Sequence, residues 1–240
     1  MKNWTKFIAL SMFVVALGLT SCSDDGSPQQ YYPAVVTCKT DQATKHAYLQ
    51  VTKNETFYPE NVSDQLFGGK EVRAYSYVKV DNKKKTPGYT YTGTIAAIDS
   101  IRTKEVVTKT AGFDPKKYGE DPIDVVNDWT SIAEDGYLTL RVRSLWNMAP
   151  IHYVNLIWDP EKATEFELLH DACGDTQGVP RDGLIAFRLP QLPLGAKHIT
   201  VHWKSLDGTQ HSHQFELDPD DGKLTEFTTY ITMGKMGQLM

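Results

Sequence analysis

The chain has few cysteines, little excess charge and no long hydrophobic run after Leu19. Its 25 basic and 30 acidic side chains give a net charge of −5, which provides no general attraction for nucleic acid. A membrane-spanning helix needs about 20 consecutive apolar residues, and no stretch after Leu19 supplies them. Three cysteines are also too few for the dense disulfide framework of small secreted domains. We therefore expect a globular chain with no nucleic-acid partner and no spanning segment in its mature part.

Motifs of familiar enzyme classes are missing as well. No Gly-x-Ser-x-Gly elbow occurs, and no cysteine lies in a recognisable nucleophile context. The acidic run at residues 218–221 lacks the ligand spacing and closing glutamate of a calcium loop, and such a sequence is an efficient turn by itself. We expect a turn at Glu120-Asp121 too. The sequence therefore predicts no catalytic residues, no metal site and no cofactor, although histidines or carboxylates that converge in a deep pocket would revive an enzyme.

The N-terminus has the layout of a secretory signal peptide. Lys2 and Lys6 are followed by a nearly continuous apolar run over residues 7–19. The run ends in a Leu-Thr-Ser-Cys sequence that resembles a lipobox, where bacteria attach a lipid to the cysteine sulfur and then cleave before it. The resemblance implies that residues 1–21 are removed and that a lipid on Cys22 anchors the mature chain in the outer membrane. An ordinary cleaved signal with an incidental cysteine is the alternative.

Residues 22–30 are polar and rich in turn-forming side chains, so we expect a flexible tether between the lipid and the first domain. Its Ser23-Asp24-Asp25 segment resembles the acidic surface-export tag of lipoproteins from Bacteroidota. A solvated spacer explains the same residues equally well. The anchored chain is thus expected at either the periplasmic face or the cell surface.

Residues 31–111 are predicted to form a small all-β domain. Short runs rich in β-branched and aromatic residues alternate with turn-forming segments, and no helical period is present. The longest run covers residues 71–80, and alternate side chains of a strand point to the same face. One face of this run therefore carries Val72, Ala74, Val78 and Val80. About five strands of this size suit an OB-like barrel or a small sandwich. The expected strands are residues 32–38, 47–51, 71–80, 89–101 and 105–108.

Residues 112–240 are predicted to form a β-sandwich domain. The boundary lies in a segment rich in glycine, proline and charge at residues 110–119. Closely spaced turns then separate eight further β patterns, while residues 160–169 could hold one helical turn at most. The expected strands are residues 129–132, 137–146, 151–158, 166–170, 184–189, 199–203, 214–217 and 224–231.

Two cysteines remain after Cys22. Cys38 ends an apolar run and is interpreted as a small buried hydrophobe, whereas Cys173 lies in a polar turn. Export would allow a disulfide between them, and the sequence leaves that pairing open.

Four histidines within sixteen residues, at positions 198, 202, 211 and 213, suggest a metal site. A two-residue Asp207-Gly208 turn would gather them on one face. A three-residue loop that pairs Ser205 with Thr209 shifts the register by one, and His198 and His202 then point away from the other two. Because the second register keeps the apolar side chains on one face, we favour it and expect the histidines on the solvent face and hairpin rim.

An OB-like barrel raises the possibility of glycan or nucleic-acid binding, for which exposed aromatic side chains would be the signature. Candidate rings are Tyr75, Tyr77, Tyr89 and Tyr91. The first two lie opposite the apolar face of their strand and are expected on the barrel exterior. The basic triplet at residues 83–85 lies in a turn, where charge is usually only solvated.

The order of lipobox, small barrel and sandwich resembles the NigD-like lipoproteins of Bacteroidota. The most specific matching segments are Gly119-Glu120-Asp121-Pro122 and Leu169-His170-Asp171-Ala172-Cys173-Gly174-Asp175. The resemblance implies a non-enzymatic envelope lipoprotein that binds a protein or peptide, in the manner of a bacteriocin-immunity protein. It brings no catalytic residues with it, and the ligand-binding residues stay unknown. A surface glycan-binding accessory lipoprotein is the alternative.

Overall fold

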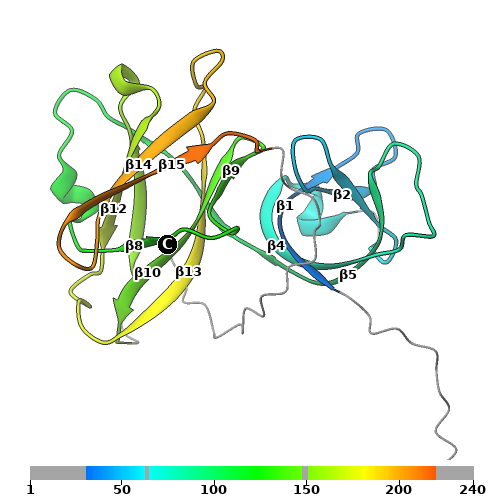
Figure 1. Ribbon diagram of the computed structural model, residues 1–240, viewed down its shortest axis with the longest axis horizontal. Helices are drawn as coiled ribbons and strands as arrows, with labels where there is room; N and C mark the ends of the chain where they lie inside the picture. The colour runs from blue at the N-terminus through cyan, green and yellow to red at the C-terminus, as the bar shows by residue number, and fades with distance from the viewer. Residues whose placement is uncertain (1–30, 63–64, 148–150, 220–240) are drawn as a thin grey trace, which may run out of the picture.

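The computed structural model describes residues 31–62, 65–147 and 151–219. This part is nearly all β, and two units lie side by side: a closed five-stranded barrel and a sandwich of two sheets (Figure 1). Around the barrel the strand order is β1-β2-β3-β5-β4, and β4 pairs back onto β1. The prediction of an OB-like barrel followed by a sandwich is confirmed. The barrel strands are β1 (Tyr32–Thr40), β2 (Ala47–Gln50), β3 (Thr56–Pro59), β4 (Val72–Val80) and β5 (Tyr91–Ser100).

Alternation of side chains builds the barrel core. Val36, Leu49, Phe57 and Ala74 have no exposed surface and pack together inside the barrel. Their strand neighbours point outward, as the period of two requires. Four of the five strands predicted for this domain form barrel strands, whereas the fifth, at residues 105–108, belongs to the sandwich. Strand β3 is missing from the expected strands, because it is only four residues long and ends in proline.

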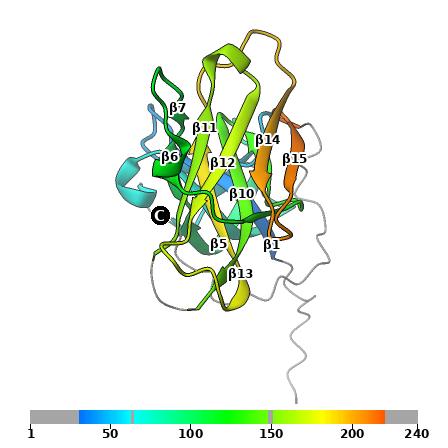
Figure 2. The same ribbon diagram turned by 90° about the vertical axis from the view of Figure 1, so that its left-hand side faces the viewer.

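Ten strands form the two sheets of the sandwich. One sheet has the order β6-β13-β10-β8, with β9 also paired to β10, and the other has the order β15-β14-β12-β11-β7. Figure 2, in which the sandwich faces the viewer, shows β11, β12 and β14 in front of β10 and β13. The strands are β6 (Arg102–Glu105), β7 (Val107–Thr108), β8 (Asp124–Val126), β9 (Ile132–Glu134), β10 (Tyr137–Trp146), β11 (Tyr153–Trp158), β12 (Glu165–Asp171), β13 (Val179–Arg188), β14 (His198–Lys204) and β15 (Gln210–Glu216).

The sandwich core comes from the inner faces of both sheets. Leu140 and Phe187 from one sheet pack with Leu156, Phe166 and Val201 from the other, and all five are buried. Burial of such side chains is the main stabilising contribution, at about 1.5–3 kcal/mol each. The expected strand at residues 224–231 lies outside the described residues.

The connection from barrel to sandwich is itself part of both sheets. Strand β6 pairs in parallel with β13, and β7 pairs in parallel with β11 in the opposite sheet. Both strands precede the domain boundary predicted between residues 111 and 112. The sandwich therefore begins before that boundary, at β6. Only a few residues separate these strands from the end of β5, so no flexible linker intervenes between the two units.

An apolar cluster joins the two units. Val35 and Tyr75 from the outer side of the barrel are buried against Ile101 and Ala186. Tyr75 also lies 6.0 Å from the ring of Trp129. The barrel and the sandwich therefore share a packed interface in addition to their covalent connection.

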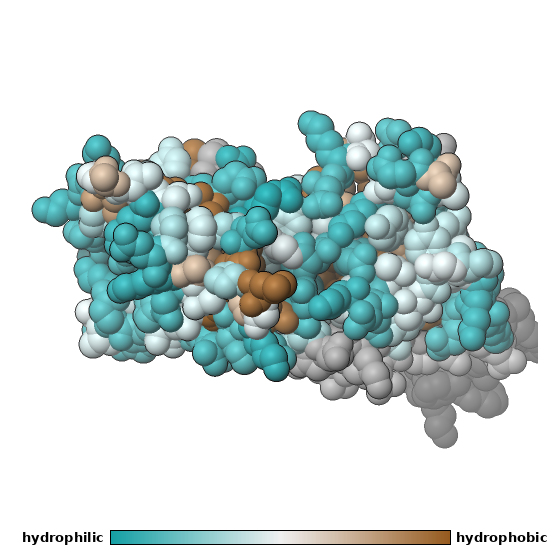
Figure 3. Space-filling view, turned by 90° about the horizontal axis from the view of Figure 1, so that it is seen from above, coloured by the Kyte–Doolittle hydropathy of each residue, from teal (hydrophilic) through white to brown (hydrophobic). Residues whose placement is uncertain are grey.

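In the described part of the chain, helical structure is limited to three short 3₁₀ segments: η1 (Leu66–Gly69), η2 (Pro115–Tyr118) and η3 (Pro160–Lys162). The third is the single turn expected within residues 160–169. Within the described ranges, no helix has the length and apolar character needed to cross a bilayer. Seen from above, the surface is mostly hydrophilic over both units, and hydrophobic side chains gather in one small area of the sandwich close to the barrel (Figure 3).

Candidate functional site

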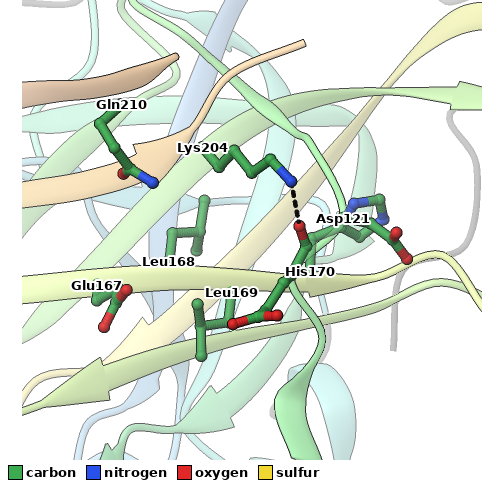
Figure 4. Close-up of a pocket in the computed structure, with 8 residues that line it drawn as sticks. Asp121, Glu167, Leu168, Leu169, His170, Lys204 and Gln210 are labelled. Carbon is green, nitrogen blue, oxygen red and sulfur yellow. Dashed lines mark hydrogen bonds between the residues drawn. The ribbon is translucent and has the colours of Figure 1, made fainter. Parts of the chain in front are cut away.

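A pocket of about 250 Å³ opens on the solvent-facing side of strands β12 and β14. The segment that follows η2 forms one wall, and β12, β14 and the start of β15 form the rest (Figure 4). Its polar lining contains three carboxylates, one amine and one amide. The lining residues are Glu120, Asp121, Glu167, Leu168, Leu169, His170, Lys204 and Gln210.

The wall of this pocket is held by hydrogen bonds to backbone atoms. Lys204 Nζ donates to the carbonyl of Glu120 at 3.1 Å, as Figure 4 shows. The backbone N–H of Asp121 donates to the His170 carbonyl at 2.9 Å, and the Asp121 carboxylate accepts from Ala172 N–H at 2.9 Å. Asp121 is therefore engaged in structure, whereas the Glu167 side chain is exposed.

Glycine is required where this wall meets β12. Gly119 has a φ of 87°, and a Cβ atom built there would lie 2.3 Å from the His170 carbonyl oxygen. Only glycine tolerates both the backbone conformation and the close approach. Gly119 thereby sets the position of the two residues that follow it.

His170, which lines the pocket, contacts a second buried histidine, His152. His152 Nδ1 lies 3.0 Å from His170 Nε2, and His170 Nδ1 lies 3.0 Å from the Pro122 carbonyl. Because a carbonyl only accepts, His170 carries its proton on Nδ1, and His152 donates to His170 Nε2. Burial, reinforced by the neighbouring His152, lowers the pKa of His170. His152 is 0% exposed and His170 is 2% exposed, so a substrate can reach neither ring.

A buried carboxylate lies beside the pair. Asp175 Oδ2 lies 3.5 Å from His152 Nε2, and the Asp175 carboxylate also accepts from Asn147 N–H. Trp146 stacks on the His152 ring at 4.7 Å. The network joins β10, β11, β12 and the turn after β12 into one unit, so its role is to fix the floor of the pocket.

A second buried polar network lies between the barrel and the sandwich. Arg73 of β4 donates to Thr37 at 3.1 Å, to Thr139 at 3.0 Å and to Glu134 at 2.5 Å. Burial raises the pKa of Glu134, and the Arg73 charge opposes that shift. Alternation along β4 points Arg73 to the outer face of the barrel, and the sandwich covers that face. The signal available in the sequence was the charge of Arg73 at an outward position, followed two residues later by the aromatic ring of Tyr75. Together they could have indicated that this face is covered.

The four late histidines adopt the arrangement favoured from the sequence. Ser205 N–H donates to the Thr209 carbonyl at 2.9 Å, and His202 pairs across the hairpin with Ser212 rather than with His213. His202 contacts Glu165 on the solvent side, and His211 contacts Asp207 at 3.0 Å. Among the described residues no three histidine, cysteine or carboxylate side chains converge as a metal site.

The four candidate tyrosines separate into three groups. Tyr75 and Tyr77 lie on the barrel exterior as expected, but they pack into the interface with the sandwich, so they offer no exposed binding surface. Tyr91 packs against the barrel core and donates its hydroxyl to Glu55. Tyr89 is partly exposed on the barrel and contacts Tyr48 and Tyr58, which sequence reasoning did not select.

The cysteines occupy different environments. Cys38 is buried in the barrel, where desolvation raises its pKa to about 12, and Cys173 is exposed in the turn after β12. Both are free thiols, so the disulfide left open by the sequence is not formed. Cys22 and the tether at residues 22–30 lie outside the described residues.

Comparisons with known proteins agree with the two-unit architecture. Residues 105–217 match the family of NigD-like C-terminal β-sandwich domains. No curated protein matches the chain. Several solved structures share its fold, and three of them are described below. Each is less than 25% identical to this chain, so the likeness concerns the fold alone.

One is a NigD-like immunity protein from Bacteroides caccae, with 21% identity, a TM-score of 0.53, and coverage of 78% of this chain and 97% of that one. A protein from Parabacteroides distasonis described as a candidate toxin-related protein has 22% identity, a TM-score of 0.62, and coverage of 80% and 95%. A candidate lipoprotein from Bacteroides fragilis has 13% identity, a TM-score of 0.58, and coverage of 80% and 100%.

Proposed function

Residues 105–217 belong to the NigD-like C-terminal β-sandwich domains, and from this premise we propose that the chain is a non-enzymatic envelope lipoprotein that binds a protein or peptide partner. The partner we propose is a bacteriocin-like protein or peptide, because a relative with the same fold is described as an immunity protein. Cys22 carries the lipid in this proposal, and the outer membrane is its location.

The observation that carries the proposal is the size and character of the pocket beside β12. Sites that enclose small substrates measure about 300–1,000 Å³ and are mostly apolar. This one has a volume of about 250 Å³ and is lined by carboxylates, an amine and an amide. Such a surface accepts a polar side chain of a larger partner better than it encloses a substrate. His152 and His170 are buried, which favours a structural role for them.

Charge reversal at the pocket tests the partner proposal. Glu167 is exposed in the pocket, so Glu167→Lys should weaken capture of a bacteriocin-like partner from the outer-membrane fraction of the source cells by about tenfold. Glu161→Lys makes the same change of charge on η3, outside the pocket lining, and should leave capture unchanged. Equal capture by wild type and Glu167→Lys would contradict a partner site at this pocket.

The anchor needs its own experiment. Mass spectrometry of the mature N-terminus should show residues 1–21 removed and a diacylglyceryl thioether on Cys22. Cys22→Ala should release the chain from the membrane fraction, because the acyl chains supply the membrane affinity. An unmodified Cys22 in a membrane-free mature chain would instead identify an ordinary cleaved signal.

A further inference from the structure

Four aromatic rings meet on the outside of the barrel. His46 ends the loop after β1, Tyr48 is on β2, Tyr58 is on β3, and Tyr89 ends the loop before β5. We call these four side chains the ring cluster. The loop before β5 lies on the side of the barrel away from the sandwich (Figure 1). Each ring is partly exposed, and no described element of the sandwich covers them.

The rings form a continuous series of contacts. His46 stacks on Tyr58 with 4.2 Å between ring centroids and an interplanar angle of 15°. Tyr89 lies 5.2 Å from Tyr58 and 5.7 Å from Tyr48, tilted by 55° and 58°. The cluster therefore presents adjoining ring surfaces in two orientations.

Hydrogen bonds hold the cluster in place. His46 Nε2 donates to the Pro59 carbonyl at 3.1 Å, which fixes the imidazole against Tyr58. Asp41 closes the loop that carries His46, because Asp41 Oδ1 accepts from Ala43 N–H and Thr44 N–H. The Asp41 N–H also donates to the His46 carbonyl at 2.9 Å. A ligand would therefore meet a surface that needs little ordering.

These rings are not needed for the barrel core. Leu49 and Phe57 alternate with them along β2 and β3 and fill the interior. Tyr75 and Tyr77, at outward positions of β4, are accounted for by the sandwich that covers them. The ring cluster has no such cover among the described residues, so its aromatic surface faces solvent.

The polar atoms around the rings indicate what they would contact. No described residue hydrogen-bonds to the hydroxyls of Tyr48, Tyr58 or Tyr89, so each can donate to and accept from a ligand. Asp41 is close enough to Tyr89 that its charge contributes to raising the Tyr89 pKa, after burial. Asp41 thus adds a carboxylate acceptor at the edge of the cluster.

Charge narrows the ligand class. The Asp41 carboxylate disfavours a phosphate-rich chain, and the amine of Lys84 is engaged by both carboxylate oxygens of Glu60 at 2.9 Å. An aromatic face is electronegative and attracts the weakly positive C–H groups of a sugar ring. Hydroxyl groups at the rim of the same sugar match the tyrosine hydroxyls and the carboxylate.

We infer that the ring cluster is a binding site for a neutral sugar unit of an oligosaccharide. The sugar packs its C–H face on Tyr58 or Tyr89 and exchanges hydrogen bonds with the surrounding hydroxyls and Asp41. The inference goes beyond the proposed partner binding by the sandwich, since it rests on different residues in the other unit.

Affinity electrophoresis in native gels tests the inference, with the detergent-solubilised full chain run through gels that contain yeast mannan, xylan, laminarin or dextran. We expect at least one polysaccharide to retard the wild-type chain. Tyr58→Ala and Tyr89→Ala should each weaken that retardation by about tenfold or more. Tyr153→Ala removes an exposed tyrosine from β11 of the sandwich and should change nothing.

Tyr58→Phe is the control for a folding defect. It keeps the aromatic ring, so it should retain most of the retardation. Thermal melts that match wild type identify variants that fold. Lack of retardation in all four gels would overturn the inference. So would equal retardation of a folded Tyr58→Ala chain, or binding of single-stranded oligothymidylate that the tyrosine variants abolish. None of these three results bears on the pocket beside β12, which Glu167→Lys tests separately.

Discussion

Arg73 in the barrel and Glu134 in the sandwich form an ion pair of 2.5 Å across the junction of the two units, and the two side chains are 0% and 4% exposed. Two threonines, one from each unit, accept the remaining guanidinium hydrogen bonds described for Arg73. The junction therefore depends on polar groups that have no access to water once the units have met.

Removal of Arg73 alone should be severe. Arg73→Met leaves Glu134 buried without its cation, which should lower the free energy of unfolding by about 3–5 kcal/mol. The double variant Arg73→Met/Glu134→Leu should recover most of the loss, because no unpaired charge remains. Urea denaturation followed by tryptophan fluorescence measures both. Lys84→Met breaks an exposed pair and serves as the control, with almost no change expected. Equal stability of the single and double variants would contradict this account.

Two glycines with similar φ should respond differently to alanine. Gly119→Ala brings a Cβ against the backbone of β12 at a φ of 87°, so the free energy of unfolding should fall by about 3 kcal/mol or more. Gly112 has a φ of 82° but open space around it, so Gly112→Ala should cost only about 1 kcal/mol. Denaturation midpoints of the two variants measure the difference, and indistinguishable midpoints would show that the close approach at Gly119 is relaxed at little cost.

The free energy of unfolding should decrease on mild acidification, because His170 is harder to protonate in the folded chain. Its pKa is lower in the folded chain than in the unfolded chain, so the unfolded chain takes up the proton first as pH falls. The stabilising contribution is present above the ordinary histidine pKa of about 6.5 and is lost as pH falls toward the folded value. His170→Gln removes this titration and should flatten the decrease between pH 8 and pH 5. Thermal melts across that range provide the measurement, and parallel curves for the two proteins would exclude a contribution from His170.

The two thiols should differ in reactivity. In a Cys22→Ser chain at pH 8, a maleimide should label exposed Cys173 in the folded state and reach Cys38 only after denaturation, because burial blocks access and raises the Cys38 pKa to about 12. Peptide mass mapping of the labelled chain distinguishes the sites. Labelling of Cys38 at the same rate as Cys173 under native conditions would mean that the barrel opens readily.

The regular parts of the fold could be predicted because they depend on local patterns. Alternation along residues 71–80 identified the inner face of β4, and loop geometry with apolar matching gave the register that pairs Ser205 with Thr209. Each of these features is determined within a strand or a single hairpin.

The rest depends on surfaces that meet only in three dimensions. Alternation places Arg73, Tyr75 and Tyr77 outward, but it carries no information about the sandwich that covers them. His46 and Tyr89 are 43 positions apart in sequence, and only the closure of the barrel brings both against Tyr58. The buried histidine network is hidden for the same reason, since its members come from separate strands.

Strands β6 and β7 have a consequence for how this architecture can be inherited. A gene fragment that begins at the change in composition near residue 112 would encode a sandwich lacking one strand from each of its sheets. Recombination that exchanged barrels at that point would therefore deliver an incomplete partner. We expect the barrel and the sandwich to be passed on together, and a chimaera to require a crossover before Arg102.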